Sequence, residues 1–122
     1  MMRYLKSGDI SEEQIQRTVF EYIRLHPEIS KYIIHIPNEG KRSPRYGKML
    51  KSIGMRPGVP DIFIAKARHG YHGAWIELKS AKGKLSDAQK LFLDTMNENG
   101  YYTMICYSIE EAINVINGYC LN

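Results

Sequence analysis

The stretch GVPDIFIAKARHGYHGAWIELK, residues 58–79, decides the fold of this chain. Two apolar runs, 59–66 and 74–80, flank the turn sequence RHGYHG, and this pattern is typical of a β-hairpin. Each run carries a carboxylate where a buried strand normally has none, Asp61 in the first and Glu77 in the second. A buried carboxylate is unfavourable unless it is paired, so both residues require a structural or chemical reason.

The hairpin predicts where the charged side chains lie. Successive side chains of a strand point to opposite faces, so Glu77 and Lys79 share one face while Leu78 faces the core. An antiparallel pairing brings Asp61, which follows Pro60, alongside the end of the second strand. Two close carboxylates repel each other unless a cation lies between them, and such oxygen ligands suit Mg²⁺ or Mn²⁺. We therefore expect one packed face and one face that displays a carboxylate and an ammonium.

Helices and strands alternate along the rest of the chain. Ser11, Ser86 and Ser108 each stand three residues before a Gln or Glu, the capping-box pattern at a helix start. The expected elements are a helix from Ser11 to His26, a strand at 32–36, a short helix at 44–53, the hairpin strands, a helix from Ser86 to before Gly100, a strand at 101–107 and a helix from Ser108 to near Gly118. This order predicts an α/β fold, with a mixed β-sheet flanked by α-helices in a single domain over 1–122.

Composition bounds the setting in which the protein works. The chain has 122 residues, and no apolar run approaches the roughly 20 residues that a membrane span needs. Its first ten residues lack the long apolar core of a secretory signal. The chain has only two cysteines, Cys106 and Cys120, which is too few for a disulfide scaffold or a zinc knuckle. We expect no membrane association, and two free thiols in a reducing cytoplasm.

Positive charge is concentrated in one segment. Lys and Arg exceed Asp and Glu by 17 to 13, and the segment KRSPRYGKMLKSIGMR, residues 41–56, contains no acidic residue. Such a segment is either a solvated basic face or a surface that contacts the phosphates of a nucleic acid. The candidates for phosphate contact are Lys41, Arg42, Arg45, Lys48, Lys51 and Arg56.

Two further polar residues have alternative explanations. Glu12 lies on the apolar stripe of the first helix, which favours a site role, although an acid in a first turn also interacts well with the helix dipole. Glu13 fits the dipole role better. Gln89 is either the cap partner of Ser86 or a site residue. The pair Glu77 and Lys79 has a second explanation as well, an ion pair on a solvated sheet edge.

The acidic and basic positions together carry a resemblance to a known family. Pro60-Asp61 followed by Glu77-Leu78-Lys79 resembles the motif of the PD-(D/E)xK nucleases. The wider pattern is similar to the VRR-NUC branch in its compact, stand-alone, phage-type form, over about residues 10–115. The positions that carry this similarity are Glu12 to Gln16, His35-Ile36-Pro37-Asn38, Gly58-Val59-Pro60-Asp61, Glu77-Leu78-Lys79, Gly83, Leu85-Ser86 and Gln89.

The resemblance implies a restriction-endonuclease-like fold and a Mg²⁺-dependent endonuclease, in which Mn²⁺ substitutes, acting on branched, flapped or four-way-junction DNA as in DNA repair. Asp61 and Glu77 would bind the metal, with the backbone carbonyl of Leu78 and with Glu12 as further ligands. Lys79 would act on the attacking water or the transition state, and Gln89 would bond that water or Lys79. The sequence does not decide whether the site binds one metal ion or two.

The resemblance also suggests a viral source and action in the host cytoplasm. A homodimer would let a small chain cut both strands of a junction. Two alternatives to the nuclease are a non-catalytic nucleic-acid-binding module with the same fold and a structural domain whose charges form surface pairs.

Overall fold

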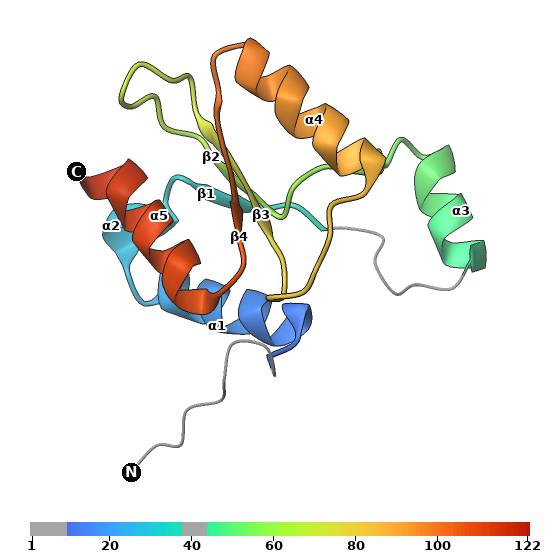
Figure 1. Cartoon of the computed structure of the whole chain (residues 1–122), viewed down its shortest axis with the longest axis horizontal. Coiled ribbons are helices and arrows are strands. Elements are labelled where there is room, and N and C mark those ends of the chain that lie inside the picture. Colours follow the sequence, from blue (N-terminus) through green and yellow to red (C-terminus); the bar gives the residue numbers. More distant parts are fainter. Residues whose placement is uncertain (1–9, 38–43) are drawn as a thin grey trace.

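The computed structural model describes residues 10–37 and 44–122. It shows a mixed four-stranded sheet with flanking helices, which confirms the predicted fold class (Figure 1). The elements are α1 (Glu12–Arg24), α2 (Pro27–Ser30), β1 (Ile33–His35), α3 (Pro44–Ser52), β2 (Ile62–Ile64), β3 (Ala74–Leu78), α4 (Asp87–Glu98), β4 (Tyr102–Cys106) and α5 (Ile109–Leu121).

The sheet has the strand order β1-β2-β3-β4. β1 pairs with β2 and β2 with β3, both antiparallel, so the hairpin predicted from the sequence is present. β4 lies parallel to β3, because the chain crosses over through α4 between them. Pro60 lacks an N–H group for a strand ladder, and β2 begins only at Ile62, later than predicted.

Helices cover both faces of the sheet. α1 and α5 enclose the main core on one face, where Ile15, Val19 and Ile76 are among the fully buried side chains. On the other face, Trp75 packs against Phe92 of α4 with ring centroids 5.0 Å apart. The second face carries Glu77, as predicted, but α4 also packs on it, which the sequence did not predict (Figure 1).

Serine caps begin the three long helices, as predicted. The side-chain oxygens of Ser11, Ser86 and Ser108 each accept a hydrogen bond from the backbone N–H three residues later. The reciprocal half of the capping box is made by Gln89, whereas Gln14 donates instead to Thr18.

Two helix boundaries differ from the prediction. α5 does not end near Gly118 but continues to Leu121, because Tyr119 and Cys120 are buried in the core. Lys66 Nζ and Arg68 Nη1 also donate to the Cys120 carbonyl, at 3.0 and 2.9 Å, and so stabilise the end of the helix. The short helix α2 was not predicted. Pro27 stands at its first turn and Ile29 is its buried anchor.

Within the described ranges, no helix is both long and apolar enough to cross a membrane. Cys106 and Cys120 are buried free thiols, and burial raises the pKa of Cys106 to about 12. The lysines and arginines of the basic segment that the structure describes lie on or just after α3, which stands apart from the main body (Figure 1).

Candidate active site

Asp61 is a fully enclosed carboxylate at the start of the hairpin. It is 1% exposed. Its Oδ2 accepts the backbone N–H of Leu78 at 2.8 Å, and its Oδ1 accepts the side-chain amide of Gln16, also at 2.8 Å. Pairing of Ile62 with Ile76 means that the next residues outward, Asp61 and Glu77, lie opposite each other. The hairpin register therefore brings the two acids together, as the sequence predicted.

Glu77 is a second buried carboxylate, and it is 3% exposed. Burial, followed by the negative charge of Asp61, raises the pKa of Glu77 from 4.5 to about 8, while Lys79 acts to lower it. Its Oε2 lies 3.5 Å from Lys79 Nζ and accepts a hydrogen bond from Gln89 at 3.2 Å. A solvated ion pair on a sheet edge does not describe this environment, so that alternative is wrong.

Lys79 is the cation of the site, and its side chain is 12% exposed. Its Nζ lies 3.6 Å from Glu12 Oε1, so it contacts acids from α1 and from β3 at once. Its backbone N–H donates to the Cys106 carbonyl, which fixes the chain just beyond β3. A Cβ added at Gly83 would lie 3.2 Å from the stem of Lys79, so this loop packs closely on the lysine.

Helix α1 separates the two acids of its first turn. Glu12 reaches Lys79, whereas Glu13 forms an exposed ion pair with Arg17 at 3.1 Å. The structure therefore brings Glu12, and not Glu13, to the carboxylate pair. Gln16 lies one turn after Glu12 and contacts Asp61 directly. Gln16 is among the positions that carry the family resemblance, but no role in the site was predicted for it. Its spacing of four residues from Glu12, which places both on one side of a helix, was the available signal.

Gln89 completes the helix cap and also contacts Glu77, rather than Lys79 as one expectation had it. Its Oε1 accepts the backbone N–H of Ser86 at 2.8 Å, and its Nε2 donates to Glu77. The loop that leads to Asp61 also packs on this end of α4. Gly58 has a φ of 85°, and a Cβ there would lie 2.7 Å from the backbone of Ala88. A side chain at position 58 would therefore disturb the junction between the hairpin and α4.

The donor set fits a hard divalent cation. Asp61 and Glu77 supply buried, opposed carboxylates, and Mg²⁺ characteristically takes one or two carboxylates and keeps several waters. Among the residues that the structure describes, no group of three or more His, Cys, Asp or Glu side chains is arranged to hold a metal ion. The described residues in that search include His69 and His72 of the hairpin.

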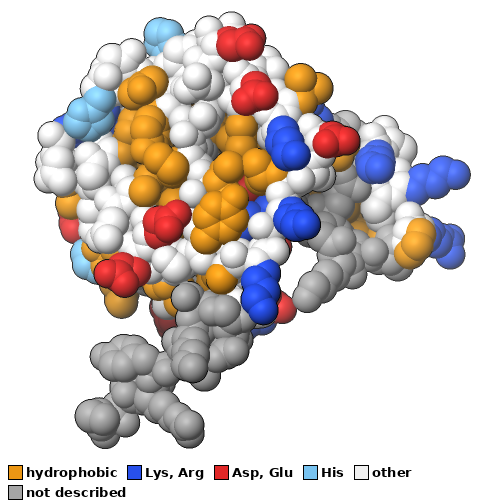
Figure 2. Space-filling view, viewed as in Figure 1, with side chains coloured by type: hydrophobic (Ala, Val, Ile, Leu, Met, Phe, Trp, Pro, Cys, Tyr) orange, Lys and Arg blue, Asp and Glu red, His pale blue; other side chains and the backbone are white. Residues whose placement is uncertain are grey.

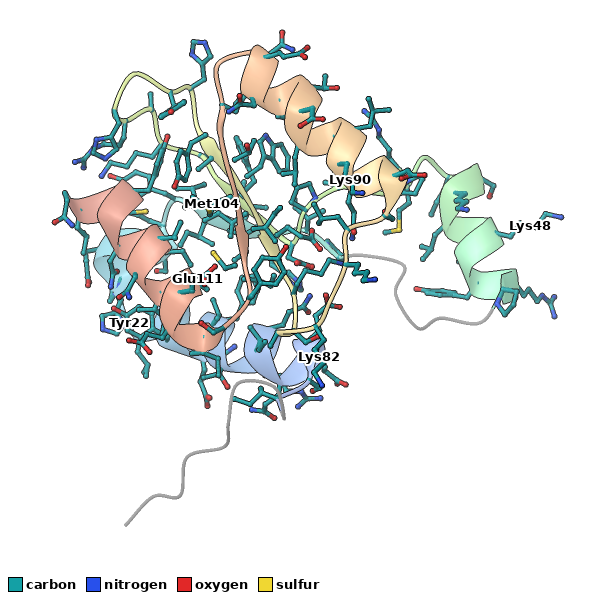
Figure 3. All side chains as sticks on the ribbon, in the orientation of Figure 1. Tyr22, Lys48, Lys82, Lys90, Met104 and Glu111 are labelled. Carbon is teal, nitrogen blue, oxygen red and sulfur yellow. The ribbon has the colours of Figure 1, made fainter. Side chains whose placement is uncertain are left out.

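A basic surface lies on the side of the molecule that carries α3. Arg45, Lys48 and Lys51 are exposed on α3, and the guanidinium of exposed Arg56 lies 5.3 Å from the ring centroid of Phe92. Figure 2 shows that most Lys and Arg side chains on this face gather on the side that carries α3. In Figure 3, Lys48 points away from the body, and Lys82 and Lys90 lie on the side facing α3. The predicted contacts Lys41 and Arg42, together with Asn38, lie outside the described residues.

The mixed sheet, with Asp61, Glu77 and Lys79 at one end of its hairpin, defines a restriction-endonuclease-like fold. The family model of the VRR-NUC domain matches residues 10–110, so the chain belongs to the VRR-NUC family. A solved structure described as a VRR_NUC domain protein is 27% identical, with a TM-score of 0.76, and the match covers 90% of this chain and 88% of that one. No curated protein matches the chain. Family membership carries a nuclease-type function and binding to nucleic acid.

Proposed function

We propose that the chain is a Mg²⁺-dependent endonuclease that hydrolyses phosphodiester bonds in branched, flapped or four-way-junction DNA. The observation that carries this proposal is the pair of buried, opposed carboxylates, Asp61 and Glu77. A protein that only binds nucleic acid gains nothing from two repelling acids, whereas a metal-dependent hydrolase needs them. Family membership supports the same reaction class.

Each residue of the site has a proposed role. Asp61, Glu77 and the Leu78 carbonyl would hold the cation, which Mn²⁺ can replace, and Glu12 would bind it directly or through water. When bound, the cation would lower the pKa of a coordinated water and offset charge on the scissile phosphate. Lys79, held between Glu12 and Glu77, would place a positive charge beside the reacting phosphate. Gln89 would fix the orientation of Glu77.

The test is cleavage of labelled linear, flapped and four-way-junction DNA with Mg²⁺, Mn²⁺ or EDTA. Asp61→Ala and Lys79→Ala should each lower the rate by more than about 100-fold, the upper range seen when only outer partners of a metal are removed. Both variants should retain DNA binding. Asp94→Ala, which changes an exposed acid on α4 outside the site, is the matched control and should cut normally. Salt-sensitive binding without cleavage of any substrate would instead identify a binding module.

We also propose a homodimer, because one site per chain must otherwise act twice to resolve a symmetric junction. Sedimentation at working concentrations should give twice the chain mass of 14.1 kDa. A purely monomeric protein would contradict this assembly. The compartment we propose is the reducing cytoplasm, including that of a host cell for a virally encoded chain, where two buried free thiols persist.

A further inference from the structure

Gln16 makes a long-range contact to the most enclosed acid of the site. Its Nε2 lies 2.8 Å from Asp61 Oδ1, and 45 residues separate the two positions in the chain. The other carboxylate oxygen of Asp61 accepts the N–H of Leu78. Each oxygen of Asp61 therefore has its own donor, one from a helix and one from a strand. Neither the sequence motif nor the roles proposed above assign this function to Gln16.

Two donors on separate oxygens fix the plane of a carboxylate. The terminal torsion of an aspartate is broad, so one hydrogen bond leaves its plane free to turn. An ionised carboxylate only accepts hydrogen bonds, and the Gln16 amide must therefore present its nitrogen to Asp61. This fixes the amide orientation as well, so that helix α1 and the hairpin hold Asp61 from two sides.

The chemistry of the donor matters as much as its position. A glutamine amide supplies an N–H group without positive charge, so it orients an acid and leaves its negative charge available to a cation. Glu77 has the corresponding contact from Gln89 of α4. Each acid of the pair thus accepts a neutral amide from a different helix. A lysine or arginine in place of Gln16 would compete with a divalent cation for the charge of Asp61, as Lys79 already does at Glu77.

We propose that Gln16 is a positioning residue that sets the plane of the Asp61 carboxylate for divalent-cation binding. This inference rests on the proposed metal-dependent function of the same site. It predicts that loss of the Gln16 N–H weakens metal binding first, and lowers the cleavage rate through it. High metal concentration should then restore much of the activity, which a general defect in folding or packing would not allow.

The experiment measures Mn²⁺ binding to the full chain by calorimetry, for wild type and for Gln16→Met. Methionine keeps the length of the side chain and removes the donor. Mn²⁺ should bind about 10-fold to 100-fold more weakly, the range typical for removal of an outer partner. The Mg²⁺ concentration for half-maximal cleavage should rise by a similar factor, while the rate at saturating Mg²⁺ stays within a few-fold of wild type. Gln14→Met, an exposed change on the same helix, is the control and should alter neither value.

A second variant compares the effect of a neutral N–H donor with that of a charged donor. Gln16→Lys keeps an N–H donor near Asp61 but adds a positive charge, so it should fold and yet bind Mn²⁺ more weakly than wild type. If Gln16→Met fails to fold, Gln16→Ala also removes the donor and carries the test. Wild-type Mn²⁺ affinity in the variant that lacks the donor would overturn the inference even if wild type cuts DNA. A wild type that binds Mn²⁺ but cuts nothing overturns the proposed function alone, and the binding isotherms still decide the role of Gln16. A wild type that binds no Mn²⁺ overturns both.

Discussion

At the scale of single residues, Glu77 carries the main electrostatic conflict of the molecule. Its carboxylate is buried opposite another acid, and its only described cationic contact, Lys79, is shared with Glu12. Burial and Asp61 outweigh that lysine and raise the pKa of Glu77 to about 8. Near neutral pH, the metal-free protein therefore holds a proton on Glu77 that the unfolded chain would release.

This conflict makes the stability of the metal-free protein depend on pH. Between pH 4.5 and about 8 the folded chain binds more protons at Glu77 than the unfolded chain does. The contribution of Glu77 to the free energy of unfolding should be largest below pH 4.5 and be lost as pH rises through about 8. Thermal melts in EDTA should therefore show a lower Tm at pH 8 than at pH 5, and Mg²⁺ should raise the Tm most at pH 8.

Glu77→Gln should flatten this dependence, because the amide has no proton to lose. Glu98→Gln, an exposed change on α4, should leave it as in wild type. If the melts in EDTA showed the same pH dependence for wild type and Glu77→Gln, the electrostatic account of Glu77 would be wrong.

At the scale of elements, α4 links stability to the site through its first turn. Ser86 caps the helix, and Gln89 completes the cap while also holding Glu77. Ser86→Ala should lower the free energy of unfolding by about 1 kcal/mol through loss of the cap. Because Gln89 keeps its bond to Glu77, the cleavage rate should change little.

Gln89→Ala should lower both stability and the cleavage rate, since it removes the two contacts together. Urea unfolding and initial cleavage rates on the same preparations make the comparison. A Ser86→Ala protein that loses activity as severely as Gln89→Ala would show that the cap, rather than the contact with Glu77, is what the site requires.

Local signals in the sequence predicted the helices and strands well, but they predicted less well which side chains bury the acids of the site. Serine caps and the hairpin pattern act over a few residues, so they identified the helix starts and the pairing of Asp61 with Glu77. The burial of Glu77 depends on α4 covering the sheet face, and the contact of Gln16 spans 45 residues. Neither has a local signature. α5 passes through Gly118 because core packing outweighs the weak helix propensity of glycine.

At the scale of the whole molecule, the separation of α3 from the body gives the basic surface a distinct role. Arg45, Lys48 and Lys51 are exposed on this helix, and Lys48 points away from the body (Figure 3). Contacts of this kind to the phosphate backbone give affinity without sequence preference. The site and the surface can therefore be altered independently.

Replacing Arg45, Lys48 and Lys51 with alanine should weaken binding of DNA of any sequence and reduce its salt dependence. Each lost phosphate contact should lower the slope of log affinity against log salt by about 0.9 for duplex DNA. Fluorescence anisotropy across a salt series measures both effects. Lys31→Ala, which removes a cation stacked over Tyr32 near α2, should change neither. An unchanged salt slope in the triple variant would place the DNA elsewhere.

The residues of the site come from distant parts of the sequence, so the site cannot assemble early in the synthesis of the chain. Glu12 and Gln16 emerge first, Asp61 gains its second donor only when Leu78 has been added, and the backbone at Lys79 is fixed by Cys106. A nascent or truncated chain that lacks β4 therefore has the acids but not their arrangement. Cleavage activity is therefore expected only from the completed fold, and not from a chain that ends before β4.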